Sequence, residues 1–422
     1  MKLKLSSPQV GIKINEWYRQ ICGFHVMKAE KLKAEIEQEI LEMEQDQNLL
    51  LFYQLMDFRH KVMLEYFEPA KKASNDEEIK NLLETIEHSQ TKLTDMLEYY
   101  VHFFTGMFEF EQRNYLSAIA YYRSAEKKLN LISDDIERAE FYFKLAEIYY
   151  HMKQTHFSMH YALQALDTYS AYRTYTLRII HCEFVIGANY DDLKCYEHAL
   201  PYFKNALKRA RSIGNPRVIG SALFNLGNCY YQMNDLAEAS RYLKDSIEVF
   251  EKENLTHLNR SLDPLFMLTQ ILFKQKQIEE SLTLYQQGIM KACELEDEIY
   301  ICKFQFLKAL YVDADITIID DTLDLLEDKR LYPDIEELAL DAAHYYNELG
   351  LFEVSTRFYE RKIQAISKIQ NGGHLYENEF DSSFIGSNCR IIGHESAAIG
   401  REREPYGACG QTPYNSGDYR IS

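Results

Sequence analysis

One short polar stretch near the N-terminus has the composition of a site that meets another molecule. It reads Glu42-Met43-Glu44-Gln45-Asp46-Gln47-Asn48, six polar residues out of seven, and Leu49-Leu50-Leu51-Phe52-Tyr53 follows directly. The pattern fits a solvated junction between two helices with Asp46 as the N-cap, and it also fits a polar tip that is presented to a partner. The residue types leave both interpretations open.

Other kinds of catalytic chemistry find no support in the residue spacing. The eight Cys are scattered without a CxxC pair, and no Cys/His cluster has metal-ligand spacing, so we expect free thiols and no metal site. The thirteen His are dispersed, and His60 is expected to be a bundle or interface residue. No Gly-rich phosphate loop and no Ser/His/Asp arrangement is evident.

Composition narrows the class of protein further. The net charge of −18 is too acidic for a sequence-general nucleic-acid binder. The N-terminus lacks an apolar signal region, and no run of 18 apolar residues occurs, so we expect a cytoplasmic protein that does not span a membrane. Only 17 Gly and 8 Pro in 422 residues favour an all-α fold.

An internal repeat organises most of the chain. A small residue recurs with spacings of 40, 41, 40 and 42 residues, at Gly106, Ala146, Gly187, Gly227 and Thr269. Each is followed twelve residues later by a second small residue and seven residues after that by a third, with a bulky residue between the second and third in most units. This is the tetratricopeptide pattern of paired antiparallel helices, here in long units. With two weaker units after them we count about seven, and we expect a concave groove lined by the first helix of each unit.

The segments outside the repeats divide the remaining chain. Helical apolar spacing over 9–24, 26–44 and 48–67 predicts an N-terminal three-helix bundle, with Ser6 as a cap before Pro8. We therefore predict a bundle over 1–70, a helical linker over 71–98, repeats over 99–370 and a tail over 371–422. Eight of the 17 Gly lie in that tail, which predicts disorder, and we assign it no function.

Several motifs in these segments resemble the Rap family of bacilli. They are Lys13-Ile14-Asn15-Glu16-Trp17-Tyr18, Met43-Glu44-Gln45-Asp46-Gln47, Phe58-Arg59-His60 and Tyr115-Leu116-Ser117-Ala118-Ile119. The likeness covers roughly residues 5 to 376. It implies a cytoplasmic regulator with a three-helix bundle and seven long tetratricopeptide repeats, which binds a response regulator and is switched off by a small secreted peptide that re-enters the cell.

The resemblance also implies an activity and its residues. In the phosphatase members, which act in the sporulation phosphorelay, the catalytic glutamine falls on Gln47. An amide has no useful basic lone pair, so Gln47 would orient the attacking water, and the partner would supply the Mg²⁺. Residues that resemble the receiver-contacting positions are Phe24, Asp46, Leu50 and Phe58, although Leu50 and Phe58 fit ordinary bundle core equally well. Gln45 departs from the family, because many relatives carry an acidic residue there.

Candidate peptide-binding residues lie on the first helices of the repeats. Asp192 and Asn225 match family positions that hold the main chain of the regulatory peptide, and an Asn amide can both donate to and accept from a peptide unit. Asn228 faces the same groove, and Gln305 in the sixth unit is a further candidate. The peptides of this family are pentapeptides that usually carry a basic residue, which the acidic chain would attract.

Three other functions remain as alternatives. The first is a non-catalytic Rap protein that sequesters a response-regulator transcription factor and blocks its DNA binding. The second, a peptide-sensing protein that itself binds DNA, is disfavoured because the N-terminal 70 residues lack a basic recognition-helix stripe. The third, a generic scaffold or co-chaperone, would not need Gln47.

Overall fold

The computed structural model describes residues 6–67, 81, 83, 93–112 and 114–374, and every extended regular element in these ranges is helical. The all-α prediction is therefore confirmed. The predicted linker over 71–98 lies mostly outside the described residues, and so does the predicted tail from residue 375 on. No helix among the described residues is both long enough and apolar enough to cross a membrane.

Three helices form the N-terminal bundle, α1 (Ser7–Cys22), α2 (Val26–Glu42) and α3 (Gln47–Phe67). Ser6 is the N-cap residue of α1 and Pro8 lies in the first turn, but the Ser6 side chain makes no capping hydrogen bond. The core is built around Trp17, whose ring stacks on Tyr53 at 5.6 Å and meets the edge of His60 at 5.4 Å. His60 is thus a core residue of the bundle, as predicted.

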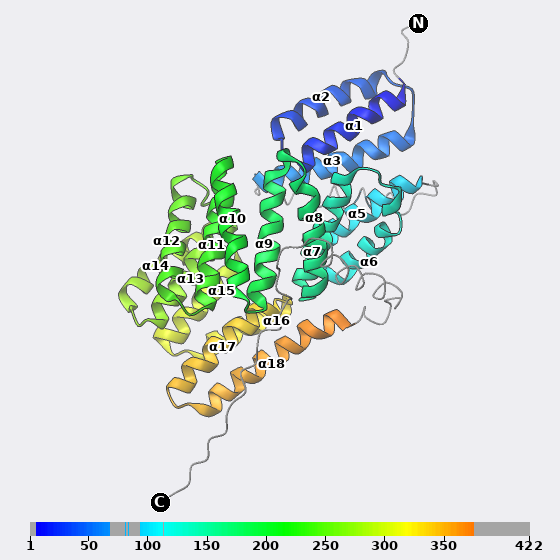
Figure 1. Cartoon of the computed structure of the whole chain (residues 1–422). Helices are drawn as coiled ribbons and strands as arrows, with labels where there is room; N and C mark the ends of the chain where they lie inside the picture. Colours follow the sequence, from blue (N-terminus) through cyan, green and yellow to red (C-terminus); the bar gives the residue numbers. More distant parts are fainter. Residues whose placement is uncertain (1–5, 68–80, 82, 84–92, 113, 375–422) are drawn as a thin grey trace, which may run out of the picture. The chain divides into compact units, whose positions relative to one another are not determined.

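Seven helix pairs follow among the described residues (Figure 1). They are α5 (Asp95–Glu111) with α6 (Tyr115–Glu126), α7 (Asp135–His151) with α8 (Thr155–Ser170), α9 (Thr176–Asp192) with α10 (Tyr196–Ile213), α11 (Pro216–Gln232) with α12 (Leu236–Lys252), α13 (Leu262–Lys274) with α14 (Ile278–Glu294), α15 (Glu298–Lys308) with α16 (Ile316–Asp328), and α17 (Tyr332–Glu348) with α18 (Phe352–His374). From α5 to α15, each first helix contacts the first helix of the next pair, which makes a continuous row.

Small residues let the two helices of a pair approach closely, as the repeat pattern requires. A Cβ atom at Gly106 would come within 2.5 Å of the Tyr122 ring, and one at Gly187 within 2.6 Å of the Phe203 ring. In the second pair, the buried Ser158 donates through Oγ to the Ala146 carbonyl at 2.9 Å. Ser355 does the same to Ala343 at 2.8 Å in the last pair, which confirms the weakest predicted unit.

The first repeat begins earlier than the predicted boundary at residue 99. Helix α5 begins at Asp95, because the Thr94 side chain accepts a hydrogen bond from the Leu97 backbone N–H at 3.4 Å and caps the first turn. At the other end, α18 reaches His374 rather than ending at 370. The six Cys in the described residues are free thiols, as predicted.

Candidate functional site

The polar stretch between α2 and α3 is an exposed tip held by one capping contact. Met43 ends α2 and is buried, and the chain then turns through Asp46 into α3. Asp46 Oδ1 accepts the Leu49 backbone N–H at 3.1 Å, so Asp46 is the cap of α3. Gln47 is the first residue of α3, and its side chain is exposed. The structure therefore confirms the solvated helix junction with Asp46 as the cap, and it leaves the Gln47 side chain accessible.

The other predicted receiver-contacting residues differ in their exposure and in the helices that they contact. Leu50, one turn after Gln47, is 36% exposed and lies beside the tip. Phe58 is buried, with its ring edge against Phe104 of α5 at 5.6 Å, so a receiver could reach it only if α3 moved away from α5. Phe24 has a left-handed backbone, with φ of 57°, and lies under the Arg178 guanidinium at 4.7 Å. Only Asp46, Gln47 and Leu50 gather at one surface.

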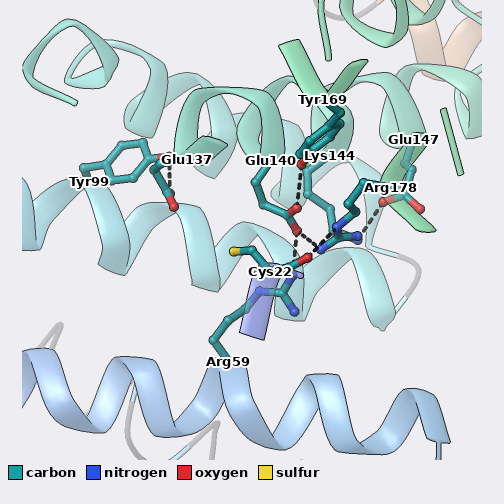
Figure 2. Close-up of polar contacts among 9 residues, drawn as sticks. All are labelled: Cys22, Arg59, Tyr99, Glu137, Glu140, Lys144, Glu147, Tyr169 and Arg178. Carbon is teal, nitrogen blue, oxygen red and sulfur yellow. Dashed lines mark hydrogen bonds and ion pairs between the residues drawn. The ribbon is translucent and has the colours of Figure 1, made fainter. Parts of the chain in front are cut away.

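A buried charge network joins the bundle to the repeats (Figure 2). Glu140 of α7 accepts from Arg59 of α3 at 2.6 Å and from Arg178 of α9 at 2.5 Å, both through Oε1, while Tyr169 of α8 donates to Oε2 at 2.9 Å. The Arg178 Nε also donates to the Cys22 carbonyl at the end of α1, at 3.2 Å. We call Arg59, Glu140, Tyr169 and Arg178 the bundle–repeat network. It connects two bundle helices to three repeat helices.

The charges of this network stabilise one another. Burial alone would raise the pKa of Glu140, but Arg178 and Arg59 outweigh it, and the pKa is lowered. Burial likewise opposes the charged form of Arg59, and Glu140 more than compensates, so the pKa of Arg59 is raised. Glu140 is completely buried, and its two arginine partners are almost completely buried. Removing Glu140 would leave the two arginines as unpaired charges in a dry interface.

A second buried carboxyl lies one turn earlier on α7. Glu137 accepts from the Tyr99 hydroxyl of α5 at 2.7 Å through Oε1, and its Oε2 has no hydrogen-bond partner. Burial raises the pKa of Glu137 to about 8, which the Tyr99 and Tyr18 hydroxyls only partly offset. Tyr18 belongs to α1, so this group also responds to the position of the bundle.

Three of the four predicted peptide-binding residues, Asp192, Asn225 and Asn228, lie in the C-terminal halves of α9 and α11. The Asn228 Nδ2 donates to Asp191 Oδ2 at 3.1 Å, and Lys153, in the turn between α7 and α8, donates to Asp192 Oδ2 at 2.8 Å. Asn225 is half-buried, one turn before Asn228. Gln305 is exposed on α15 and is separated from α11 by α13 in the row of first helices. The structure thus brings Asp192, Asn225 and Asn228 together, and it leaves Gln305 apart.

The C-terminal end of α9 carries a carboxylate oxygen for which the structure shows no hydrogen-bond partner. Asp191 is buried, and its Oδ1 has no hydrogen-bond partner in the structure. Burial raises its pKa to about 6, and the neighbouring Asp192 adds to the effect. A basic group or a peptide N–H that entered here would satisfy Asp191. In the described part of the chain, no three His, Cys, Asp or Glu side chains are placed to hold a metal ion.

The bundle–repeat network has no local signature in the sequence. Arg59 and Glu140 are 81 residues apart, and Glu140 and Arg178 are 38 apart, so no local pattern connects them. One signal was available. Glu137 and Glu140 stand on the apolar face of α7 among Ile136, Ala139, Phe141 and Phe143, where an isolated carboxylate would be costly.

Two segments of the chain match known families. Residues 4–65 match the family described as response regulator aspartate phosphatase H, N terminal, and residues 183–252 match a tetratricopeptide repeat family. The described bundle and the third and fourth helix pairs coincide with these ranges.

Relatives cover nearly the whole chain. It is 50% identical to response regulator aspartate phosphatase A of Bacillus subtilis (strain 168) over 378 residues, 89% of this chain and 99% of the relative. A crystal structure of a Rap protein complexed with competence and sporulation factor, 40% identical, superposes with a TM-score of 0.79 and covers 86% of this chain and 99% of its own. The crystal structure of the apo form of RapI is 36% identical and covers 86% of this chain and 99% of its own. It superposes with a TM-score of 0.63. The chain belongs to the Rap family of response regulator aspartate phosphatases.

Proposed function

We propose that this protein hydrolyses the aspartyl phosphate of a response regulator, with Gln47 at the reacting centre. The exposed Gln47 at the first position of α3 is the observation that carries the proposal, together with the 50% identity to response regulator aspartate phosphatase A. The family and its activity agree with the prediction from the sequence. The role of Gln47 rests on its position and on its chemistry.

Hydrolysis of the aspartyl phosphate requires this protein only to position the Gln47 amide and the attacking water molecule. An aspartyl phosphate lies in a receiver domain that binds its own Mg²⁺, so this chain needs no metal site for the reaction. The Gln47 amide oxygen can accept a hydrogen bond from a water molecule and its NH₂ can donate to a phosphoryl oxygen, which orients the water for in-line attack. The Asp46 carboxylate is already engaged at the α3 cap, so it holds Gln47 at the start of the helix.

Inhibition by a small signalling peptide agrees with the same family and with the polar residues Asp192, Asn225 and Asn228 on α9 and α11. In the arrangement described here, the bundle is joined to the repeats by the bundle–repeat network and Phe58 is covered by α5, so we take this as the arrangement that a bound peptide would favour. A peptide inhibits to the extent that it binds this arrangement more tightly than an open one. Such peptides and receivers meet inside the cell, which favours a cytoplasmic location.

The sequestering alternative is not favoured by the comparisons. Regulatory proteins RapF and RapC of Bacillus subtilis are 41% and 42% identical to this chain, below the 50% of response regulator aspartate phosphatase A. A direct test separates the two. It follows the loss of radiolabelled phosphate from a phosphorylated single-domain response regulator with the intact protein, Gln47→Ala, and Gln45→Ala as the matched neighbour.

We expect rapid loss of phosphate with the wild-type protein and with Gln45→Ala. Gln47→Ala should slow it by about 10²-fold, the order expected when an attacking group loses its orientation. Complex formation, measured by gel filtration, should survive both substitutions because both side chains are exposed. Phosphate loss no faster than the spontaneous rate with the wild-type protein would overturn the phosphatase assignment.

A further inference from the structure

The second helices of the fourth and fifth helix pairs leave a groove between them. A cavity of about 370 Å³ is lined by side chains of α12 and α14 and by Leu268 of α13. Leu268 is buried and forms the floor, while Ile247 of α12 and Leu284 of α14 are half-buried along the walls. We call this cavity the outer groove, because it lies on the side of the second helices, away from the row of first helices.

The rim of the outer groove is acidic. Glu248 and Glu251 of α12 and Glu280 of α14 are exposed there. Among the described residues that line the cavity, only Lys244 is cationic, and it is paired with Glu280 at 3.5 Å. Lysine and arginine side chains lay their methylene stems on apolar surface and keep their charged ends at a polar edge. An apolar floor beneath an acidic rim therefore fits long cationic side chains.

Helix α10 carries such side chains at the matching positions of the preceding repeat unit. The spacing between these two units is 40 residues, so Lys208 of α10 corresponds to Glu248 of α12. Arg211 corresponds in the same way to Glu251. Lys208 and Arg211 are exposed, and neither forms an ion pair with another described residue. The charge on this side of the repeats is thus inverted from one unit to the next.

A surface with this charge pattern is complementary to a second copy of itself. A two-fold axis parallel to α10 and α12 lays α10 of one copy along the outer groove of the other, and the symmetry repeats the same contact. Such an axis keeps residues at the same level along the helices, so Lys208 meets Glu248 of the second copy and Arg211 meets Glu251. Helix α10 then lies as a ridge between α12 and α14, which is an ordinary way for helices to pack.

We propose that a second copy of this chain occupies the outer groove, and that Lys208 and Arg211 of α10 are the side chains that enter it. The result is a symmetric dimer formed through the second helices of the third, fourth and fifth pairs. The proposal is independent of the proposed function, because Gln47 and the polar residues at the C-terminal ends of α9 and α11 are not part of this surface.

The test measures the mass of the full-length protein by sedimentation velocity over a series of concentrations. One variant carries Lys208→Glu with Arg211→Glu, which makes α10 acidic. The other carries Glu248→Lys with Glu251→Lys, which makes the rim of the outer groove basic. All four side chains are exposed, so both variants should fold, and melting curves by circular dichroism verify this.

The matched control is Lys28→Glu with Lys31→Glu on α2 of the bundle. These two lysines are exposed and three residues apart, as Lys208 and Arg211 are, and the change of net charge is the same.

We expect the wild-type protein and the control to form dimers at concentrations of about 10 µM. Each of the two test variants alone should have a dimer dissociation constant raised by at least about 10²-fold, because like charges then face each other at both contacts. An equimolar mixture of the two variants should form a heterodimer, since both contacts again join opposite charges. A variant that is merely misfolded would not be rescued in this way.

Three results would overturn the proposal. A wild-type protein that stays monomeric over the whole series would show that a second copy does not occupy the outer groove. Dimers that both test variants retain would place the contact elsewhere on the chain. Folded variants that stay monomeric when they are mixed would contradict the pairing of α10 with the outer groove.

Discussion

The tip of the bundle and the contact between the bundle and the repeats differ in the exposure and the charge of their side chains. At the tip, Gln47 and Gln45 are exposed and uncharged, and one capping bond from Asp46 holds the turn. At the contact, Arg59, Glu140 and Arg178 are buried ions that tie together helices far apart in sequence. The first region can lose a side chain with little effect on folding, whereas in the second the loss of Glu140 would leave two buried cations without a counter-charge.

This difference separates two tasks. A phosphatase that works on another protein's Mg²⁺ site needs an accessible amide and no buried machinery of its own. A protein that changes state needs an interface whose two arrangements differ sharply in energy, and a buried ion network costs a great deal when it is half broken. Catalysis and control can therefore be altered independently, which substitutions can test.

The largest effect is expected from Glu140→Gln, which leaves Arg59 and Arg178 buried without a counter-charge. We expect the free energy of unfolding to fall by about 3–5 kcal/mol, measured by urea denaturation. Glu147→Gln on the same helix is the matched control, because its partner Lys144 is partly exposed, and it should cost about 1 kcal/mol or less. Equal losses for the two variants would show that the network contributes no more than a surface pair.

Phe58→Ala and Leu50→Ala each remove one apolar side chain, the first from the contact with the repeats and the second from the tip. Phe58 packs on Phe104 in the interface, so its removal should cost about 3 kcal/mol of stability. Leu50 is partly exposed at the tip, so its removal should cost less than about 1 kcal/mol of stability and should weaken receiver binding. Thermal unfolding measures the loss of stability of each variant, and a pull-down with the phosphorylated receiver measures receiver binding. A larger stability loss at Leu50 would contradict the placement of the tip.

A smaller effect is expected from the pH dependence that Glu137 imposes on the interface. Its folded pKa is about 8, and the unfolded pKa is about 4.3, so between these values the folded state holds a proton that the unfolded state releases. Stability from this group is therefore lost as pH rises through that window. Glu137→Gln should reduce the drop in Tm between pH 6 and pH 8 by a few degrees. An unchanged drop would show that Glu137 is ionised in the folded protein.

The sequence was a good guide wherever the determinants were local or periodic. The small residues at Gly106, Gly187 and Ser355 identify the helix pairs because close packing tolerates nothing larger there. Asp46 is recognisable as a cap from its position before an apolar run. Even so, the start of α5 at Asp95 was missed, because Thr94 alone marks it.

Contacts between residues far apart in the chain could not be predicted from the sequence. That Phe58 is covered by α5 depends on how the bundle lies on the repeats, which no periodicity encodes. Arg59, Arg178 and Arg217 look alike as surface cations in the sequence. Only their tertiary neighbours distinguish an arginine that is paired with Glu140 from one that stacks on Tyr66 without an anion.

The most direct test of the separation between catalysis and control is a single kinetic comparison. The loss of radiolabelled phosphate from a phosphorylated single-domain response regulator is followed with wild-type protein, Gln47→Ala and Arg59→Gln at one temperature. We predict a rate near the spontaneous one for Gln47→Ala and a rate at least equal to wild type for Arg59→Gln, because loosening the network frees the bundle. An Arg59→Gln protein that stays folded and loses as much activity as Gln47→Ala would contradict the account.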